Sequence, residues 1–459
     1  MTEPTQLAPA PVGARGKAKG RFGIAFGRRF FMLLLIGLVS IGPAWANSKY
    51  LLALALWDVL VLLLWVVDLQ RLPKPEEIEV RRLWQSTLQL REPAEATLEF
   101  LNRGKSDVLL RVQEEAPVGV RKEIPELDVR VSAGSSQTAT YSVCPRERGD
   151  MKFGDTYLRY ESTWQIAERW ASASMRQTIR IYPNFQESKK DTIYLIRSRQ
   201  IALEKRYKHQ PGQGREFDSL REYRESDEWR DICWSATARR AKLISKSYQT
   251  ERSQTVWIVL DAGRLLRTRV KGLSKLDYAV GAALSLAQVA LYSGDRVALL
   301  GYGRRILQRL PPGRGSRQIR ALLDGLALLR AEELEADHRR ATETLSVLQK
   351  RRSLIVWMTD LAETATTPEV IESATHMAKR HLVLFTVIGQ PELRTMVKER
   401  PTDTRQMFRQ TAAMEIVQRR DLLLRTLRQH GALTLEVEPS KLSTAVVNQY
   451  LMAKDRSLL

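Results

Sequence analysis

Hydrophobic residues follow a different pattern in each successive part of this chain. Two nearly unbroken apolar runs, residues 30–46 and 50–67, come first. Short runs that alternate apolar and polar residues follow as far as residue 182, and from residue 255 apolar runs of strand length alternate with helical patterns. We therefore predict membrane helices, then antiparallel strands, then an α/β domain.

The two apolar runs predict an N-terminal transmembrane helical hairpin over residues 30–69. Each run is near the roughly 20 residues that a bilayer requires, and only a short turn fits between them. Basic residues precede the first run and follow the second, so the positive-inside rule predicts a two-pass protein of the bacterial inner membrane with both termini and the soluble domains in the cytoplasm. Ala44-Trp-Ala46 offers an alternative, a signal-peptidase site, which would leave the second run as a single anchor. Residues 1–29, which are rich in basic and small residues, are expected to be disordered.

Asp58 lies near the middle of the second apolar run. A carboxylate there costs about 2.5–3.5 kcal/mol on insertion scales, so it is expected to face a polar partner rather than lipid. That partner is either the first membrane helix or another membrane subunit. The alternative is an acid that a strongly apolar helix tolerates.

Residues 76–185 contain the short alternating runs, with turn residues such as Gly104, Gly134 and Gly149 between them. Strands of this length and spacing predict a small antiparallel β-sandwich. Residues 192–213 have helical spacing and many basic residues, and we predict a linker helix there.

Residues 214–459 are predicted to form the α/β domain. Apolar runs of strand length lie at 255–260, 296–301, 353–359, 381–388 and 433–437, and helical patterns separate them. This alternation predicts a doubly wound parallel sheet with right-handed crossovers.

The charge balance is strongly basic, with a formal net charge of +21. A basic chain favours either anionic membrane lipids or nucleic acid as its neighbour. Nucleic-acid binding, through the basic helical region 402–430, is the alternative function. Against it, that region carries apolar residues at a spacing that predicts one core-facing stripe: Phe408, Ala412, Ile416, Leu423 and Leu427. The whole chain has two cysteines, Cys144 and Cys233, and they lie too far apart in the sequence for a typical metal-binding motif.

The segment 214–240 is densely charged and contains several aromatic residues. It reads Gly214-Arg-Glu-Phe, then Leu220-Arg-Glu-Tyr, Asp227, Arg230-Asp-Ile, Trp234 and Ala238-Arg. This pattern resembles the signature of domain-of-unknown-function family 58, a bacterial family with a von Willebrand factor A-like domain. The resemblance implies association with a MoxR-type AAA+ ATPase.

The signature has the aromatic anchors and charges of a protein contact surface. We therefore expect a membrane-tethered scaffold that docks a MoxR-like ATPase. The partner-binding candidates are Arg215, Glu216, Arg221, Glu222, Tyr223, Asp227, Arg230 and Trp234. Two alternatives stay open: Trp229 and Trp234 fold back as a brace over the sheet, or the charges form a solvated helix face.

The resemblance also implies a metal-ion-dependent adhesion site at the carboxyl ends of the strands. Asp261 and Asp360 match its acids, and Ser316 is the nearest candidate for a loop hydroxyl. However, Gly263 and Leu265 stand where the motif has hydroxyl residues. Either the paired acids with waters hold a weak Mg²⁺, or the site is degenerate and Arg264 or Arg267 neutralises the acids.

Other catalytic patterns are absent from the sequence. It has no phosphate-binding loop, no glycine-rich dinucleotide fingerprint, no His-Glu-x-x-His and no Gly-x-Ser-x-Gly. We therefore predict a protein that is not an enzyme, with no small-molecule substrate and no cofactor unless Mg²⁺ binds.

Overall fold

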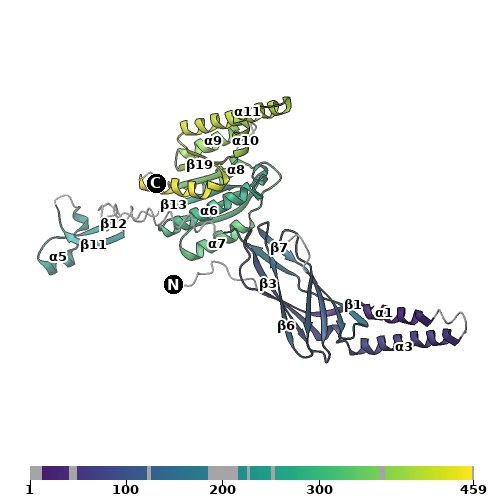
Figure 1. Ribbon diagram of the computed structural model, residues 1–459. Coiled ribbons are helices and arrows are strands. Elements are labelled where there is room, and N and C mark those ends of the chain that lie inside the picture. Colours follow the sequence, from purple (N-terminus) through teal and green to yellow (C-terminus); the bar gives the residue numbers. More distant parts are fainter. Residues whose placement is uncertain are drawn as a thin grey trace. The chain divides into compact units, whose positions relative to one another are not determined.

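The computed structural model describes residues 13–40, 49–120, 126–184, 216–224, 228–249, 254–360 and 367–456. The chain separates into two units, Met1–Asn184 with Leu326–Leu328, and Phe185–Gly325 with Leu329–Leu459. Figure 1 labels the elements of both units. The linker helix predicted over 192–213 lies outside the described residues.

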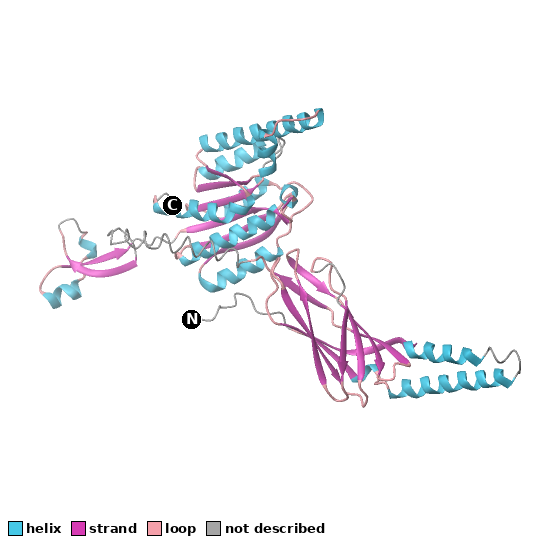
Figure 2. Ribbon diagram, viewed as in Figure 1, coloured by secondary structure: helices cyan, strands magenta, loops and turns pink. Residues whose placement is uncertain are grey.

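The first unit is built on one eight-stranded antiparallel sheet that curls toward a barrel (Figure 2). In the order β5-β4-β8-β9-β1-β2-β3-β6, the edge strands β5 and β6 also contact each other. A separate pair joins β7 (Gly149–Phe153) and β10 (Gln177–Ile181). The eight strands are β1 (Ala14–Phe26), β2 (Ile78–Trp84), β3 (Ala94–Asn102), β4 (Val108–Glu114), β5 (Glu126–Val131), β6 (Ser136–Val143), β8 (Thr156–Ser162) and β9 (Ala167–Ala173).

The predicted β-sandwich is wrong because β1 joins what would otherwise be two sheets. Residues 14–17 pair with β2, and residues 18–26 pair with β9. This strand comes from the segment expected to be disordered. Its basic residues Arg15, Lys17 and Lys19 are exposed while Ala18 is buried, so the alternation typical of a strand runs between charged and small residues.

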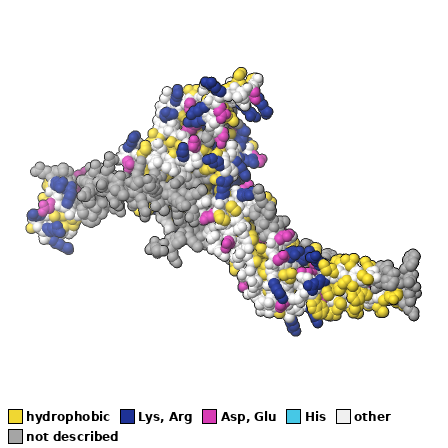
Figure 3. Space-filling view, in the orientation of Figure 1, with side chains coloured by type: hydrophobic (Ala, Val, Ile, Leu, Met, Phe, Trp, Pro, Cys, Tyr) yellow, Lys and Arg dark blue, Asp and Glu magenta, His cyan; other side chains and the backbone are white. Residues whose placement is uncertain are grey.

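Two helices, α1 (Arg28–Gly37) and α3 (Lys49–Arg71), follow β1 and precede β2 in the sequence. The two helices pack against each other. The indole N–H of Trp57 donates to the carbonyl of Leu33 at 2.8 Å. Gly37 allows this close approach, because a side chain there would meet the Trp57 ring. Figure 3 shows hydrophobic side chains gathered over this helical end of the first unit.

Among the described residues, only one helical stretch, Tyr50–Glu77, is long and apolar enough to cross a membrane, so the predicted hairpin of two transmembrane helices is wrong. The 23 residues of α3 span roughly 34 Å at about 1.5 Å per residue. The 10 residues of α1 span only roughly 15 Å, about half of a hydrocarbon core. Residues 41–48, which include the suspected cleavage site at Ala46, lie outside the described residues.

The second unit contains a six-stranded mixed sheet in the order β17-β16-β13-β18-β19-β20. Five strands are parallel, and the edge strand β17 runs antiparallel to β16. The predicted all-parallel, doubly wound von Willebrand factor A-like sheet is therefore wrong. The missed strand contains Pro311 and Pro312, and prolines suit an edge position. The strands are β13 (Thr255–Asp261), β16 (Arg296–Tyr302), β17 (Ile306–Gly313), β18 (Leu354–Thr359), β19 (Leu382–Ile388) and β20 (Leu433–Val437).

Helices pack on this sheet and bury its strands. The longest buried helix, α6, contacts β13 and β16 and pairs with α12. Trp257 and Val259 of β13 belong instead to a core shared with α8, α9 and α11. The helices are α6 (Lys275–Tyr292), α7 (Gly315–Leu328), α8 (His338–Leu348), α9 (Thr367–Ala378), α10 (Pro391–Lys398), α11 (Thr404–Gln429) and α12 (Leu442–Asp455). A short hairpin precedes α6, and each of its strands, β14 (Arg269–Val270) and β15 (Leu273–Ser274), has two residues.

The signature segment folds as an antiparallel ribbon of β11 (Glu216–Glu222) and β12 (Ile244–Gln249). A short helix, α5 (Trp234–Arg240), lies between these strands in the sequence. We call residues 216–224 and 228–249 the signature ribbon. Within the signature, Glu216–Glu222 is strand and Trp234–Arg240 is helix, so the described part of the signature is not one continuous helix.

Candidate functional site

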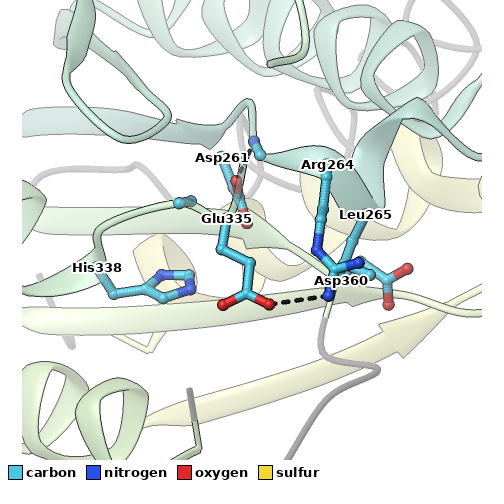
Figure 4. Close-up of a pocket in the computed structure, with 8 residues that line it drawn as sticks. Asp261, Arg264, Leu265, Glu335, His338 and Asp360 are labelled. Atoms are coloured by element: carbon cyan, nitrogen blue, oxygen red, sulfur yellow. Dashed lines mark hydrogen bonds and ion pairs between the residues drawn. The ribbon is translucent and has the colours of Figure 1, made fainter. Parts of the chain in front are cut away.

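The candidate site lies at the carboxyl ends of the central strands of the second unit (Figure 4). Asp261 ends β13, and Asp360 directly follows β18. Because these strands are parallel neighbours, the two aspartates line one small pocket, and both are buried. We call this place the acid edge. The structure thus brings together the two acids that the sequence singled out.

The predicted loop hydroxyl, Ser316, is not part of the acid edge. Gly313 at the end of β17 lies opposite Val297, whereas Asp261 lies opposite Tyr302 at the other end of β16. Because β17 is antiparallel, it carries the chain back toward the amino ends of the parallel strands. Ser316 follows it there, exposed in the first turn of α7.

Asp360 is neutralised by two buried cations from distant parts of the chain. The ammonium of Lys275 donates to Oδ2 of Asp360, and the guanidinium of Arg420 donates to Oδ1 at 3.2 Å. Arg420 also contacts Glu436 of β20 at 3.4 Å. Burial lowers the pKa of Lys275, and the neighbouring charge of Asp360 opposes this shift. The cluster joins α6, β18, α11 and β20.

The predicted neutralising residues, Arg264 and Arg267, are not the ones that pair with the acids. Arg264 pairs with Glu335 at 2.8 Å, and Arg267 pairs with Glu333 at 3.0 Å. Sequence reasoning missed Lys275 and Arg420. Lys275 had one signal, a cation at the first position of a helix, where the helix dipole disfavours positive charge.

Among the described residues, the hydrogen-bond donors to the Asp261 carboxylate are uncharged. The backbone N–H of Gly263 donates to Oδ1 at 2.6 Å, and the hydroxyl of Thr359 donates to Oδ2. Burial raises the pKa of Asp261, while His338 and these hydrogen bonds oppose the shift. Gly263 fits because a side chain there would meet the backbone of Ala336.

A hydrogen-bonded aromatic chain leads to the same pocket. The indole N–H of Trp357 donates to the hydroxyl of Tyr302 at 2.7 Å. The same hydroxyl is hydrogen-bonded to Nδ1 of His338, 2.9 Å away. Sequence reasoning missed this histidine because it belongs to no motif.

The pocket at the acid edge is small. Its volume is about 20 Å³, and its walls include Leu265 and Ala336 as well as the acids. A water molecule needs about 10–15 Å³ on the same measure, so the pocket has room for roughly one water and for no organic substrate. An open, mixed-charge groove beside it is lined by Arg264, Arg304, Glu333, Asp337 and Glu369, among others.

The acid edge does not fit a Mg²⁺ ion. Mg²⁺ requires about six oxygen ligands, whereas both oxygens of Asp360 already accept from cations, and Gly263 and Leu265 provide no side-chain oxygen. Within the described ranges, no group of three or more His, Cys, Asp or Glu residues could hold a metal ion. The two cysteines are free thiols.

The signature ribbon presents its tryptophans to solvent. Trp229 is 71% exposed and Trp234 is 65% exposed. The Tyr223 ring lies 5.9 Å from that of Trp229, and Glu222 pairs with Lys242 at 3.1 Å. Arg221 is half-buried and Arg230 is exposed. Of the other predicted partner-binding residues, Arg215 and Asp227 lie outside the described residues, and only the backbone of Glu216 is described.

Asp58 is exposed on α3. The buried acid of this helix is instead Asp68, which sequence reasoning missed. Asp68 accepts from the hydroxyl of Ser162 at 2.5 Å and from the backbone N–H groups of Ile166 and Ala167. These contacts attach the C-terminal end of α3 to the loop between β8 and β9.

These features define a chain with a curled antiparallel unit, a helix long enough to span a membrane, and an α/β unit whose acid edge is neutralised from within. Residues 219–400 match the family described as "Protein of unknown function DUF58", which confirms the resemblance seen in the signature. No functionally curated protein matches the chain significantly.

Solved structures also resemble parts of the chain at low identity. One is the conserved hypothetical protein BatB from Bacteroides thetaiotaomicron, with 15% identity and a TM-score of 0.31 over 44% of this chain and 100% of that one. Another is an aerotolerance-related membrane protein from Bacteroides fragilis, with 12% identity and a TM-score of 0.29 over 43% and 98%. Proximal thread matrix protein 1 from the mussel byssus has 11% identity and a TM-score of 0.29 over 42% and 46%.

Proposed function

We propose that this protein is a membrane-tethered interaction scaffold and that its signature ribbon docks a cytosolic MoxR-like AAA+ ATPase. The observation that carries the proposal is the exposure of Trp229 and Trp234 beside charged side chains such as Arg230. Tryptophan and arginine are enriched among the few residues that supply most of the binding energy of protein interfaces. The ATPase class comes from the family resemblance of the signature.

The acid edge supports binding rather than catalysis in this proposal. Its pocket has a volume of about 20 Å³, and hydrogen bonds engage both oxygens of each aspartate. The edge therefore offers no room for a substrate. We propose a protein that is not an enzyme and that needs neither Mg²⁺ nor another cofactor.

We further propose that α3, together with the shorter α1, anchors the protein in the bacterial inner membrane and that its soluble parts lie in the cytoplasm. The strands β1 and β2 pair in one sheet although α3 lies between them in the sequence, so the chain must return to the side that it left. Arg28, Arg29, Arg71 and Lys74 flank the apolar helices and suit an anionic cytoplasmic leaflet. Asp58, exposed within α3, supports contact with another membrane subunit.

Co-purification from cells tests the docking proposal. The wild-type chain, extracted in detergent, is expected to recover an AAA+ ATPase, and the Trp229→Ala and Trp234→Ala variants are expected to recover much less. Truncating a binding hot spot costs about 2 kcal/mol or more, which is roughly a 30-fold loss of affinity.

The matched control is Trp170→Ala, which removes a tryptophan that is 51% exposed on β9 of the other unit. This variant should recover as much ATPase as the wild type. Equal recovery by all variants, or no AAA+ protein with the wild type, would contradict the proposal.

A further inference from the structure

Each carboxylate oxygen of Asp261 and Asp360 accepts a hydrogen bond, and the hydrogen-bond donors differ between the two residues. Both oxygens of Asp360 accept from cationic groups, the ammonium of Lys275 and the guanidinium of Arg420. Both oxygens of Asp261 accept from neutral groups, the Gly263 amide and the Thr359 hydroxyl. The cationic donors of the acid edge therefore contact Asp360, and the donors to Asp261 are uncharged.

Lys275 is held at this place by its own helix. It is the first residue of α6, after the cap residue Ser274, whose hydroxyl accepts from the backbone N–H of Asp277. Its side chain is fully buried. A buried ammonium at the positive end of a helix dipole is unfavourable on both counts, so its contact with Asp360 must compensate for both.

Arg420 is the second cation that contacts Asp360, and it follows Asp360 in the sequence whereas Lys275 precedes it. Arg420 is buried on α11 and divides its guanidinium between Asp360 and Glu436. Glu436 also pairs with Arg394, at 2.7 Å, so these two arginines share that acid. Asp360 accepts from both Arg420 and the ammonium of Lys275.

We infer that Lys275 is a built-in cationic partner of Asp360 and that the acid edge stays assembled without any metal. Lys275, Asp360 and Arg420 all belong to the second unit, so the inference does not depend on the proposed ATPase partner.

Thermal unfolding of the full chain in detergent tests the inference. For the wild type, 5 mM MgCl₂ and 5 mM EDTA are expected to leave the melting temperature unchanged, because a bound ion would raise it by mass action. Lys275→Ala is expected to lower the melting temperature by roughly 6–20 °C, the range for breaking a buried ion pair in a domain of this size. The control, Lys398→Ala, removes an exposed lysine on α10 and should change little.

Two further variants separate charge from packing. Lys275→Met keeps the length of the side chain without its charge, and it too should melt below the wild type. In an Asp360→Asn background, Lys275→Ala should cost much less, as expected for a coupled pair. A wild type stabilised by Mg²⁺ would overturn the inference, as would a Lys275→Met variant as stable as the wild type or a Lys275→Ala cost unchanged by Asp360→Asn.

Discussion

Glu79 shows how single residues hold the first unit together. This buried carboxylate of β2 forms ion pairs with Arg15 of β1, with Arg81 and with Arg103. These hydrogen bonds and charges, above all that of Arg15, lower the pKa of Glu79 to about 2. Its ionised form therefore stabilises the pairing of β1 with the sheet.

The pH dependence of this contribution follows from the sign of the shift. An unfolded glutamate has a pKa of about 4.3, so the stabilisation is complete above that pH and disappears as the pH falls through about 2. Glu79→Gln is expected to lower the free energy of unfolding by about 1–3 kcal/mol at pH 7, and by progressively less from pH 4 toward pH 2. Urea unfolding of the full chain in detergent measures this difference.

Glu95→Gln is the control for this experiment, because Glu95 is exposed on the neighbouring strand β3. It should show little effect at any pH. A difference between Glu79→Gln and the wild type that stays constant down to pH 2 would contradict the assignment.

The acids of the second unit could be predicted from the sequence, whereas their partners could not. Asp261 and Asp360 each follow an apolar run, and parallel strands place their carboxyl ends at one edge. Lys275 lies 85 residues and Arg420 lies 60 residues from Asp360 in the sequence. No local pattern links residues at these separations, because only the packing of α6 and α11 on the sheet brings them together.

At the scale of elements, α11 departs from the stripe that its sequence predicts. Leu423 and Leu427 are buried in the core, but Ala412 is exposed and Phe408 is 71% exposed. The 26-residue helix contacts α9, α10 and β20. Most residues in its N-terminal half are nevertheless exposed. Helical spacing predicts which residues share a face, but it does not predict how far the neighbouring elements extend.

This difference along α11 predicts unequal costs for two similar truncations. Leu427→Ala removes a fully buried side chain and is expected to cost about 2–5 kcal/mol of unfolding free energy. Phe408→Ala removes a larger side chain but should cost no more than about 0.5 kcal/mol. Chemical unfolding of both variants measures the costs, and a Phe408→Ala cost as large as that of Leu427→Ala would show that the N-terminal half is packed.

The strand β1 was missed for a different reason. Strand prediction rests on β-branched and aromatic residues, and most of this strand consists of glycine, alanine and basic residues. Gly16 is needed at its position because a side chain there would meet the backbone of Ser174. Close packing between strands thus selects small residues, which local propensity interprets as a disordered segment.

At the scale of the whole molecule, the position of β1 restricts how the chain can meet a membrane. The strands β1 and β2 flank the two apolar helices in sequence and pair with each other in one sheet. The apolar pattern alone placed the helices, but it could not show that the N-terminal segment belongs to the domain that follows them. A lone transmembrane passage would put these paired strands on opposite sides of the bilayer.

The central claim is that the membrane-anchored chain presents its soluble parts, including the signature ribbon, to the cytoplasm. Reporter fusions that are active only in the cytoplasm or only outside it, placed at the N-terminus and at the C-terminus of the full chain, test this claim most directly. We expect both ends to report a cytoplasmic location. A C-terminal fusion active only outside the cytoplasm would contradict the claim, since no cytosolic ATPase could then reach Trp229 and Trp234.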